Sequence, residues 1–312
     1  MPTVTDGLLE RIAREAGVDC VEALVRLQPT DLQSVLMEVH RRHADRLSAT
    51  TVLKRYAESR FSRPAATDPR ELSAFEQLAW SLLPSAYEPI ELSPLCPLGT
   101  CSTVAAVDQN KAVATDRNVE VVSDSTNVLA LEAALRRRRA LRGRADEDSV
   151  VRLAASQRQV RAQSYGRPRA SAHFGLLAIV AAGRALPRSS FECGALVEQA
   201  GYYLSLLRNW RPGWAVEVVL SDFAGRRRLL EDHVLGPLQE KAPSEVTLRI
   251  DPDRQEGRGY YLDLCYKLYA RTEAGASFEV GDGGATDWTR KLISDRRERL
   301  VIGGLGVDRL LA

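Results

Sequence analysis

The stretch VVRLAASQRQVRAQSYGRPRASAHFGLLAIVAAGR, residues 150–184, decides the expected fold. Two apolar runs flank a connection that is rich in Gly, Pro and Ser, a pattern typical of an antiparallel hairpin. The connection and its flanks carry Arg161, Arg167, Arg169 and His173. Arginine offers five donors in a planar fork that matches phosphate and carboxylate oxygens, so the hairpin is a candidate polyphosphate clamp. The alternative is a solvated surface loop.

A second stretch, LVIGGLGVDRLL at residues 300–311, carries a further cation near the C-terminus. Residues 300–302 predict a buried strand, and the glycines that follow allow another backbone to approach closely. Residues 307–311 predict the start of a helix. Arg309 in the first turn of that helix would reach a ligand that lies over the sheet.

Together, the VRAQ–loop–HF segment of the hairpin and GGLGVDRLL resemble motifs 2 and 3 of the class II aminoacyl-tRNA synthetases. In that family, the arginine of motif 2 holds the α-phosphate of ATP, and the arginine of motif 3 holds the γ-phosphate. The resemblance implies these roles for Arg161 and Arg309. It also implies ATP and Mg²⁺ as ligands.

Four more segments, in the family's order, resemble elements of the class and, more closely, of its histidyl type. They are residues 71–94 (motif 1), 120–131 (the LRPE-x-T turn), 257–261 (RGLDYY) and 283–287 (GGRYD). The third segment is two residues shorter than its counterpart. Several matches in the correct order indicate more than a single motif does. The resemblance therefore implies the catalytic-domain fold of the histidyl-tRNA synthetases.

The resemblance also implies the residues of an ATP and substrate site. Arg161 and Arg258 are the expected catalytic cations, because fixed guanidinium groups stabilise the charge that grows on phosphoryl oxygens. The other expected ATP contacts are Gln163, Arg169, His173 and Arg309, and the expected substrate contacts are Asp124, Thr126, Tyr260 and Tyr261. Gln163 stands where the family has a glutamate that contacts the adenine amino group. Asp124 could instead be a helix cap, and the two tyrosines could be core residues.

The composition is that of an ordinary globular protein. The chain has 312 residues, of which 45% are hydrophobic and 27% charged, and its formal net charge is +2. No apolar run approaches the roughly 18 residues of a membrane span, and residues 1–17 lack the apolar core of a signal peptide. Five scattered cysteines predict a reduced, cytoplasmic protein. Cys96 and Cys101 have no histidine nearby, so we expect thiols there and no metal site from a protein motif.

The chain divides into residues 1–62, an expected helical N-terminal region, and residues 63–312, an expected catalytic domain of the α+β class. In the second part, strands outnumber helices and connections are short, which favours a mainly antiparallel sheet flanked by helices. Strands are expected at residues 103–107, 118–122, 216–220, 246–250, 260–270 and 277–280. The arginines of residues 136–144 end an expected helix. A solvated helix end is the simpler interpretation, and a patch that binds RNA backbone is the alternative.

The chain ends directly after the motif 3 segment, where histidyl-tRNA synthetases continue into an anticodon-binding domain of roughly a hundred residues. We therefore expect a paralogue that does not read an anticodon. In the first interpretation, it is a ligase that uses ATP to activate an amino acid or other small carboxylate as an acyl-adenylate, for a protein or RNA acceptor. In the second, it is a non-catalytic regulatory subunit, similar to the histidyl-like subunit of ATP phosphoribosyltransferase.

Two features of the sequence bear on that choice and on assembly. Retention of Arg161 and Arg309 favours the ligase, because a regulator has no need of them, whereas the altered segment around Arg258 favours the regulator. Motif 1 of the class forms a two-fold interface, so residues 71–94 predict a homodimer. No membrane partner is expected.

Overall fold

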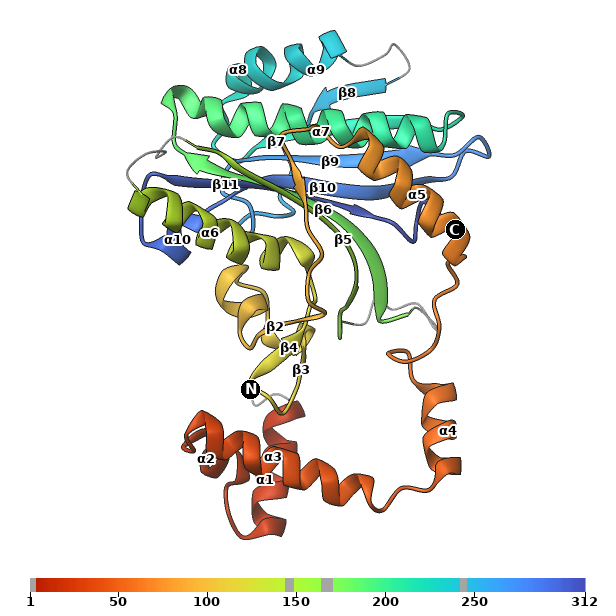
Figure 1. Cartoon of the computed structure of the whole chain (residues 1–312), viewed down its shortest axis with the longest axis vertical. Coiled ribbons are helices and arrows are strands. Elements are labelled where there is room, and N and C mark those ends of the chain that lie inside the picture. Colours follow the sequence, from red (N-terminus) through yellow and green to blue (C-terminus); the bar gives the residue numbers. More distant parts are fainter. Residues whose placement is uncertain (1–3, 144–148, 164–170, 242–245, 312) are drawn as a thin grey trace.

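The structure, a computed structural model, describes residues 4–143, 149–163, 171–241 and 246–311. An eight-stranded sheet lies at its centre (Figure 1). Across the sheet the strands follow the order β1 (Glu88–Pro89), β5 (Val151–Val160), β6 (His173–Arg184), β11 (Glu298–Gly306), β10 (Ser277–Thr286), β9 (Leu264–Arg271), β7 (Ala215–Asp222) and β8 (Val246–Ile250). The two edge pairs, β1–β5 and β7–β8, are parallel, and the neighbours between them are antiparallel. The expected mainly antiparallel sheet is confirmed.

The expected hairpin is the β5–β6 pair, which runs in register from Val151↔Ala182 to Val160↔His173. On its other side β6 pairs with β11. Residues 175–183 are buried, and a strand covered on both faces is a continuous apolar run without alternation. Residues 164–170, which include Arg167 and the expected ATP contact Arg169, lie outside the described residues.

Helices cover the two faces of the sheet unequally (Figure 1). On the face that we call the closed face, α7 (Ser190–Trp210) lies along the strands, together with α5 (Pro69–Leu82), α8 (Arg227–Leu230), η4 (Glu231–Leu235) and α9 (Gly236–Lys241). A short turn, η3 (Pro187–Ser189), leads into α7. On the other face, the cleft face, α6 (Ser125–Gly143) and α10 (Trp288–Ile293) pack against β5, β6 and β11.

A fully buried ion pair links helix α6 to the sheet. Arg137 donates to both carboxylate oxygens of Glu298 in β11, at 2.9 and 2.8 Å, and both side chains are 0% exposed. The same guanidinium also donates to the carbonyl of Ser149. The expectation of a uniformly solvated arginine run is therefore wrong at Arg137, whereas Arg138 and Arg139 are exposed.

The chain between α5 and α6 forms a short helix and a small antiparallel sheet. These are η2 (Gln109–Lys111) and the strands β2 (Leu95–Pro97), β4 (Val119–Val121) and β3 (Val113–Ala114), in that order across the sheet. The strand expected at residues 103–107 is wrong, since Thr100–Val104 form a short π-helix, η1. The cause is Glu120, a fully buried carboxylate in β4. It accepts hydrogen bonds from the backbone N–H groups of Gly99 and Cys101 at 3.0 and 2.8 Å, which curls the chain around it.

The strands near the C-terminus also differ from their expected bounds. β9 begins at Leu264, not at residue 260, because residues 257–261 form a turn in which Gly257 and Gly259 have φ values of 90° and 84°. β10 continues to Thr286, well beyond residue 280.

The glycine segment of motif 3 lies inside β11, and the helix expected after it is absent, since residues 307–310 form a turn. Close packing explains the glycines. Gly283 and Gly303 face each other across the β10–β11 pair, and a Cβ on either would lie 2.5 Å from the hydroxyl oxygen of Tyr266. The two positions are therefore glycines because a buried tyrosine occupies the space of their side chains.

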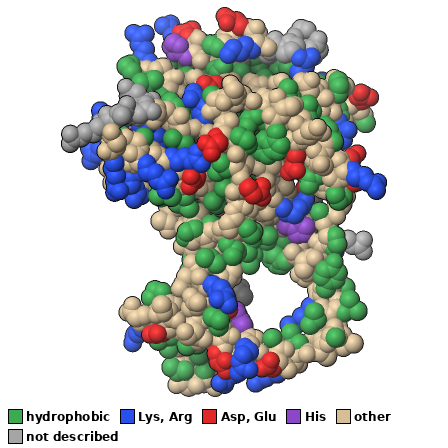
Figure 2. All heavy atoms as spheres, viewed as in Figure 1, with side chains coloured by type: hydrophobic (Ala, Val, Ile, Leu, Met, Phe, Trp, Pro, Cys, Tyr) green, Lys and Arg blue, Asp and Glu red, His purple; other side chains and the backbone are tan. Residues whose placement is uncertain are grey.

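The N-terminal region stands apart from the sheet, and Figure 2 shows an opening between the two parts. Its helices are α1 (Val4–Ala16), α2 (Cys20–Val25), α3 (Pro29–Ala44) and α4 (Ala49–Glu58). Among residues 7–58, no side chain is buried. Polar contacts join this region to the rest of the protein. For example, Asn118 Nδ2 donates to the carbonyl of Pro29 at 3.2 Å. Arg60, in the segment after α4, donates to the carbonyls of Ala162 and Gln163 beside the hairpin.

In the described part of the chain, no helix is both long enough and apolar enough to cross a membrane. All five cysteines are free thiols, and four of them are buried.

Candidate functional site

Two adjoining cavities open on the cleft face, one of about 540 Å³ and one of about 230 Å³. They share five lining residues: Asp124, Arg161, Tyr260, Tyr261 and Asp282. The larger cavity runs over β6, β10 and β11 to Arg309, and the smaller one reaches the η1–η2 segment. The shared residues therefore mark the junction of one continuous cleft.

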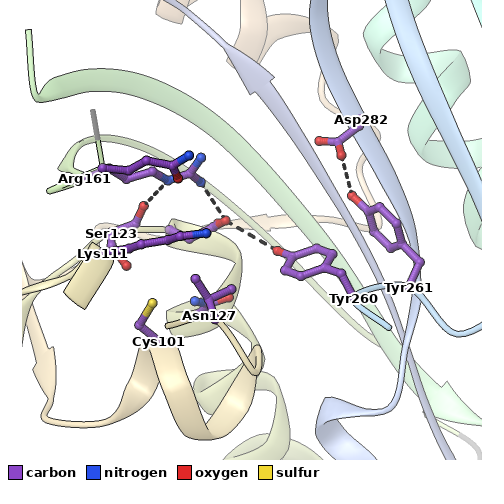
Figure 3. A pocket seen from close by; sticks show the side chains of 11 residues that line it. Cys101, Lys111, Ser123, Asn127, Arg161, Tyr260, Tyr261 and Asp282 are labelled. Carbon is purple, nitrogen blue, oxygen red and sulfur yellow. Dashed lines mark hydrogen bonds and ion pairs between the residues drawn. The ribbon is translucent and has the colours of Figure 1, made fainter. Parts of the chain in front are cut away.

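Arg161 lies at this junction, directly after β5. Its Nε donates to the carbonyl of Ser123 at 2.9 Å, and its Nη2 donates to Asp124 Oδ2 at 2.9 Å. The guanidinium lies over the ring of Phe174, 5.0 Å from the ring centroid. These contacts hold the planar group in one orientation (Figure 3), and Arg161 lines both cavities.

Asp124 organises the residues around it. Its Oδ1 accepts from the backbone N–H and the hydroxyl of Thr126, at 3.0 and 2.7 Å. Its Oδ2 accepts from Arg161 and lies 3.5 Å from the Tyr260 hydroxyl. The helix-cap interpretation and the site interpretation thus both apply, because the carboxylate caps the first turn of α6 and lines the cleft.

Tyr260 and Tyr261 line both cavities and are not simply core residues. The rings stand edge to face with centroids 4.9 Å apart, and Trp288 packs against Tyr260 at 5.3 Å. Burial raises the pKa of both phenols well above the usual value, so both hydroxyls are hydrogen-bond donors at neutral pH.

Asp282 in β10 is the second carboxylate at the junction, and Tyr261 donates to its Oδ2 at 2.8 Å (Figure 3). Burial raises the pKa of this carboxyl. The neighbouring Glu279 and Asp124 add to the rise, while the Tyr261 bond and Arg254 oppose it. Within the described residues, Asp282 has no ion pair.

Arg309, which also lines the larger cavity, is exposed and donates to the backbone carbonyl of Glu279. Asp308 beside it accepts two bonds from Arg158, at 2.9 and 3.2 Å. Gly304 and Gly306 of β11 line the same cavity. The larger cavity is thus a slot that is lined by Phe174, by glycines of β11 and by two arginines, Arg161 and Arg309.

The structure brings most of the expected site residues together. Those that line the cleft are Asp124, Thr126, Arg161, Gln163, Tyr260, Tyr261 and Arg309. Two others lie elsewhere. Both ring nitrogens of His173 form hydrogen bonds, Nδ1 with Arg158 at 3.0 Å and Nε2 with the carbonyl of Arg63 at 2.7 Å. His173 therefore contacts the segment before α5 and does not line the cleft.

Arg258 is the second residue that the structure leaves outside the cleft lining. It is exposed, lies over the ring of Phe223 at 4.8 Å and donates to Gln255 at 3.0 Å. The shortened turn at residues 257–261 directs the Arg258 side chain away from the cleft. The buried arginine of this segment is Arg254, whose guanidinium lies 5.9 Å from the ring of Tyr261.

The sequence analysis did not identify four charged residues that line the cleft: Lys111, Glu279, Asp282 and Asp308. Lys111 lines the smaller cavity, with no ion pair in the part of the chain that the structure describes. The signal for Asp282 was its place directly before the Gly283–Gly284 pair. Lys111 carried no local signal, since only the fold of the η1–η2 segment brings it to the cleft.

Comparison with known proteins bears on the fold. No family model and no curated protein sequence match the chain. Among solved structures, histidyl-tRNA synthetase from S. aureus is similar over 80% of this chain and 67% of that chain, with a TM-score of 0.58 and 14% identity. An ATP phosphoribosyltransferase regulatory subunit/histidyl-tRNA synthetase from Bacillus halodurans C is similar over 81% and 82%, with a TM-score of 0.60 and 16% identity.

A histidine–tRNA ligase subunit from Alicyclobacillus acidocaldarius is similar over 80% of this chain and 96% of that chain, with a TM-score of 0.55 and 13% identity. At these identities, the similarity shows the fold alone. The chain has a class II aminoacyl-tRNA synthetase-like α+β fold, of the kind that histidyl-tRNA synthetases and the regulatory-subunit type share. The expected fold class is confirmed.

Proposed function

We propose that the protein binds ATP in the larger cavity and uses it to activate a small carboxylate, such as an amino acid, as an acyl-adenylate. One observation carries the proposal. Arg161 and Arg309 come from segments far apart in the sequence and line the same cavity of about 540 Å³, together with Phe174 and Gly304. A cavity of this volume that is lined by two arginines and an aromatic ring matches a purine nucleotide and its phosphates.

In the proposed reaction, a carboxylate oxygen of the substrate attacks the α-phosphorus, the bond to the β-phosphate oxygen breaks, and pyrophosphate leaves. Negative charge grows on the α-phosphoryl oxygens. Arg161 is suited to stabilise this charge, because Ser123 and Asp124 already fix its guanidinium and little reorganisation is needed. No covalent protein nucleophile is required.

Mg²⁺ would arrive on the phosphate oxygens of ATP, its usual mode of binding. The described residues contain no group of three or more His, Cys, Asp or Glu that could hold a metal by themselves. The role given to Arg161 does not depend on the metal.

The second candidate is a non-catalytic regulatory subunit. The position of Arg258 outside the cleft favours it, because one cation expected to support catalysis does not reach the cavity. A regulator of this kind would bind a small molecule in the smaller cavity without consuming ATP.

ATP–pyrophosphate exchange against a panel of the standard amino acids and simple carboxylic acids tests the choice. We expect exchange with at least one acid, and a loss of roughly 100-fold or more in Arg161→Ala, the size found when one charge-stabilising donor is removed. Arg249→Ala, an exposed arginine on the edge strand β8, is the matched control and should retain exchange. Tight binding of an amino acid without exchange would support the regulator instead.

We also infer a homodimer, a protein or RNA acceptor for the acyl group, and a cytoplasmic location. Five free cysteines support a reducing compartment. β1 lies at the edge of the sheet with both residues exposed, inside residues 71–94, the motif 1 segment on which the inferred homodimer rests. Sedimentation that gives a monomer at micromolar concentration would contradict the dimer.

A further inference from the structure

Asp124 and Asp282 both face the junction of the two cavities, but their acceptor sites are differently occupied. An ionised carboxylate has about four lone-pair sites. Asp124 uses both sites of Oδ1 for Thr126, and its Oδ2 meets Arg161 and Tyr260. It therefore has no acceptor site left for a ligand unless one of these contacts breaks.

Asp282 presents the opposite case. Its one hydrogen bond within the described residues comes from the Tyr261 hydroxyl, at 2.8 Å. It has no cation within ion-pair distance there, whereas the other carboxylates of the larger cavity are paired, Glu279 with Lys267 at 3.0 Å and Asp308 with Arg158 at 2.9 Å. A largely desolvated carboxylate that lacks a partner favours a cationic ligand.

The surroundings hold Asp282 toward the cleft. Its neighbour Gly284 has no side chain, and a Cβ there would lie 2.6 Å from the ring of Tyr261. The absence of a side chain at Gly284 leaves room for the ring of Tyr261, whose hydroxyl donates to Asp282 (Figure 3). Asp282 and Arg161 both line both cavities, so one small molecule can contact the two.

We propose that Asp282 is the ammonium site of the cleft, and that the ligand of the smaller cavity is an amine-bearing carboxylate, an amino acid, with its ammonium at Asp282 and its carboxylate toward Arg161. This assignment deepens the proposed function and rests on it for the role of the carboxylate. Asp124, which the sequence analysis gives as a substrate contact, is then a positioning residue that holds Arg161 and Tyr260.

Binding by calorimetry tests the assignment without requiring catalysis. The standard amino acids are titrated into the full-length protein, and each one that binds is compared with its desamino carboxylic acid. We expect the desamino compound to bind roughly 10- to 100-fold more weakly, the loss of one charge-assisted hydrogen bond. Asp282→Asn keeps the Tyr261 bond and removes the charge, so it should bring the two ligands to similar affinity.

Glu217→Gln is the matched control, since it removes one carboxylate charge from β7 of the same sheet, away from both cavities. It should keep the wild-type preference. Equal binding of amino and desamino ligands by the wild type would overturn the proposal, whether or not the Asp282 variant folds. So would the absence of amino-acid binding at millimolar concentration, or a preference that persists in Asp282→Asn.

Two further outcomes separate this proposal from the adenylation proposal. If Asp282→Asn weakened Mg·ATP binding and left amino-acid binding unchanged, Asp282 would serve the nucleotide and the ammonium site would be wrong. If the wild type preferred amino acids but neither bound ATP nor exchanged pyrophosphate, the adenylation proposal would fail and the ammonium site would stand.

Discussion

On the closed face of the sheet, α7 packs its apolar side chains along the strands, and Tyr203 of α7 and Tyr266 of β9 are fully buried. On the cleft face, α6 lies over one part of the same strands and the rest opens into two cavities. The closed face is held mainly by hydrophobic contact. The cleft face depends on polar attachments, such as Arg137 with Glu298 and Glu120 with the η1 backbone.

The strand β11 shows the difference within two adjacent residues. Gly303 points to the closed face, where a Cβ would lie 2.5 Å from the Tyr266 hydroxyl and 3.0 Å from Gln199 Oε1. Gly304 points to the cleft, where a Cβ would meet only the Leu176 side chain at 3.3 Å. One face therefore excludes side chains to keep its packing, and the other keeps space open for a ligand.

The largest effect expected is on the attachment of the cleft face. Arg137→Ala leaves Glu298 buried without its partner, which should lower the free energy of unfolding by about 3–5 kcal/mol. Denaturation in urea measures it. Arg138→Ala, on the exposed neighbour, should change stability by at most about 0.5 kcal/mol. Equal effects of the two substitutions would show that the ion pair does not hold α6.

The next effect concerns ligand binding on the cleft face and not stability. Arg161→Ala and Arg309→Ala should each weaken ATP binding by roughly 1.5–3 kcal/mol, the size of a charge-assisted hydrogen bond. Calorimetry with Mg·ATP measures it, and Arg249→Ala on β8 should bind as the wild type does. If ATP binds equally well to all three variants, the larger cavity is not the nucleotide site.

The adjacent glycines of β11 test the comparison directly. Gly303→Ala should cost about 1–3 kcal/mol of stability, because the methyl group overpacks a closed core. Gly304→Ala should change stability by less than about 1 kcal/mol, since the restriction of the unfolded chain offsets the contact with Leu176. It should weaken ATP binding, because its methyl group would occupy the slot. Denaturation measures the stability of both variants, and calorimetry measures their ATP binding. A larger loss of stability in Gly304→Ala than in Gly303→Ala would contradict the comparison of the two faces.

The smallest effect expected is a pH dependence at Asp282. Because burial raises the pKa of this carboxyl, the folded state binds more protons than the unfolded state between the ordinary and the raised pKa. Stability contributed by this group therefore falls as pH rises through that window. Tyr261, Glu279, Asp124 and Arg254 are the charged and titratable groups that act on it.

Asp282→Asn should consequently be slightly more stable than the wild type at neutral pH, and the difference should shrink below the ordinary carboxyl pKa. Urea denaturation across pH measures this. A variant that is less stable than the wild type at neutral pH would show that an unrecognised favourable contact holds the Asp282 charge.

The sequence by itself determined the elements whose signals are local. The apolar runs on either side of the Gly/Pro-rich connection predicted the β5–β6 hairpin, and the strand expected at residues 246–250 is β8. Such patterns involve neighbours in the chain, so the local pattern of residues is enough to identify them. The order of motifs along the chain likewise indicated the fold before any contact was known.

Only the tertiary structure decided which charged side chains are buried, which are exposed and which line the cleft. Arg137 belongs to an arginine run that predicts a solvated helix end, yet Glu298, 161 positions away, draws it into the core. Arg258 matches a family motif, but the tight turn at its glycines aims it outward, while Asp282, with a weak signal, lines both cavities. The physical reason is that burial and pairing set the environment of a charged group, and both depend on contacts between residues far apart in the sequence.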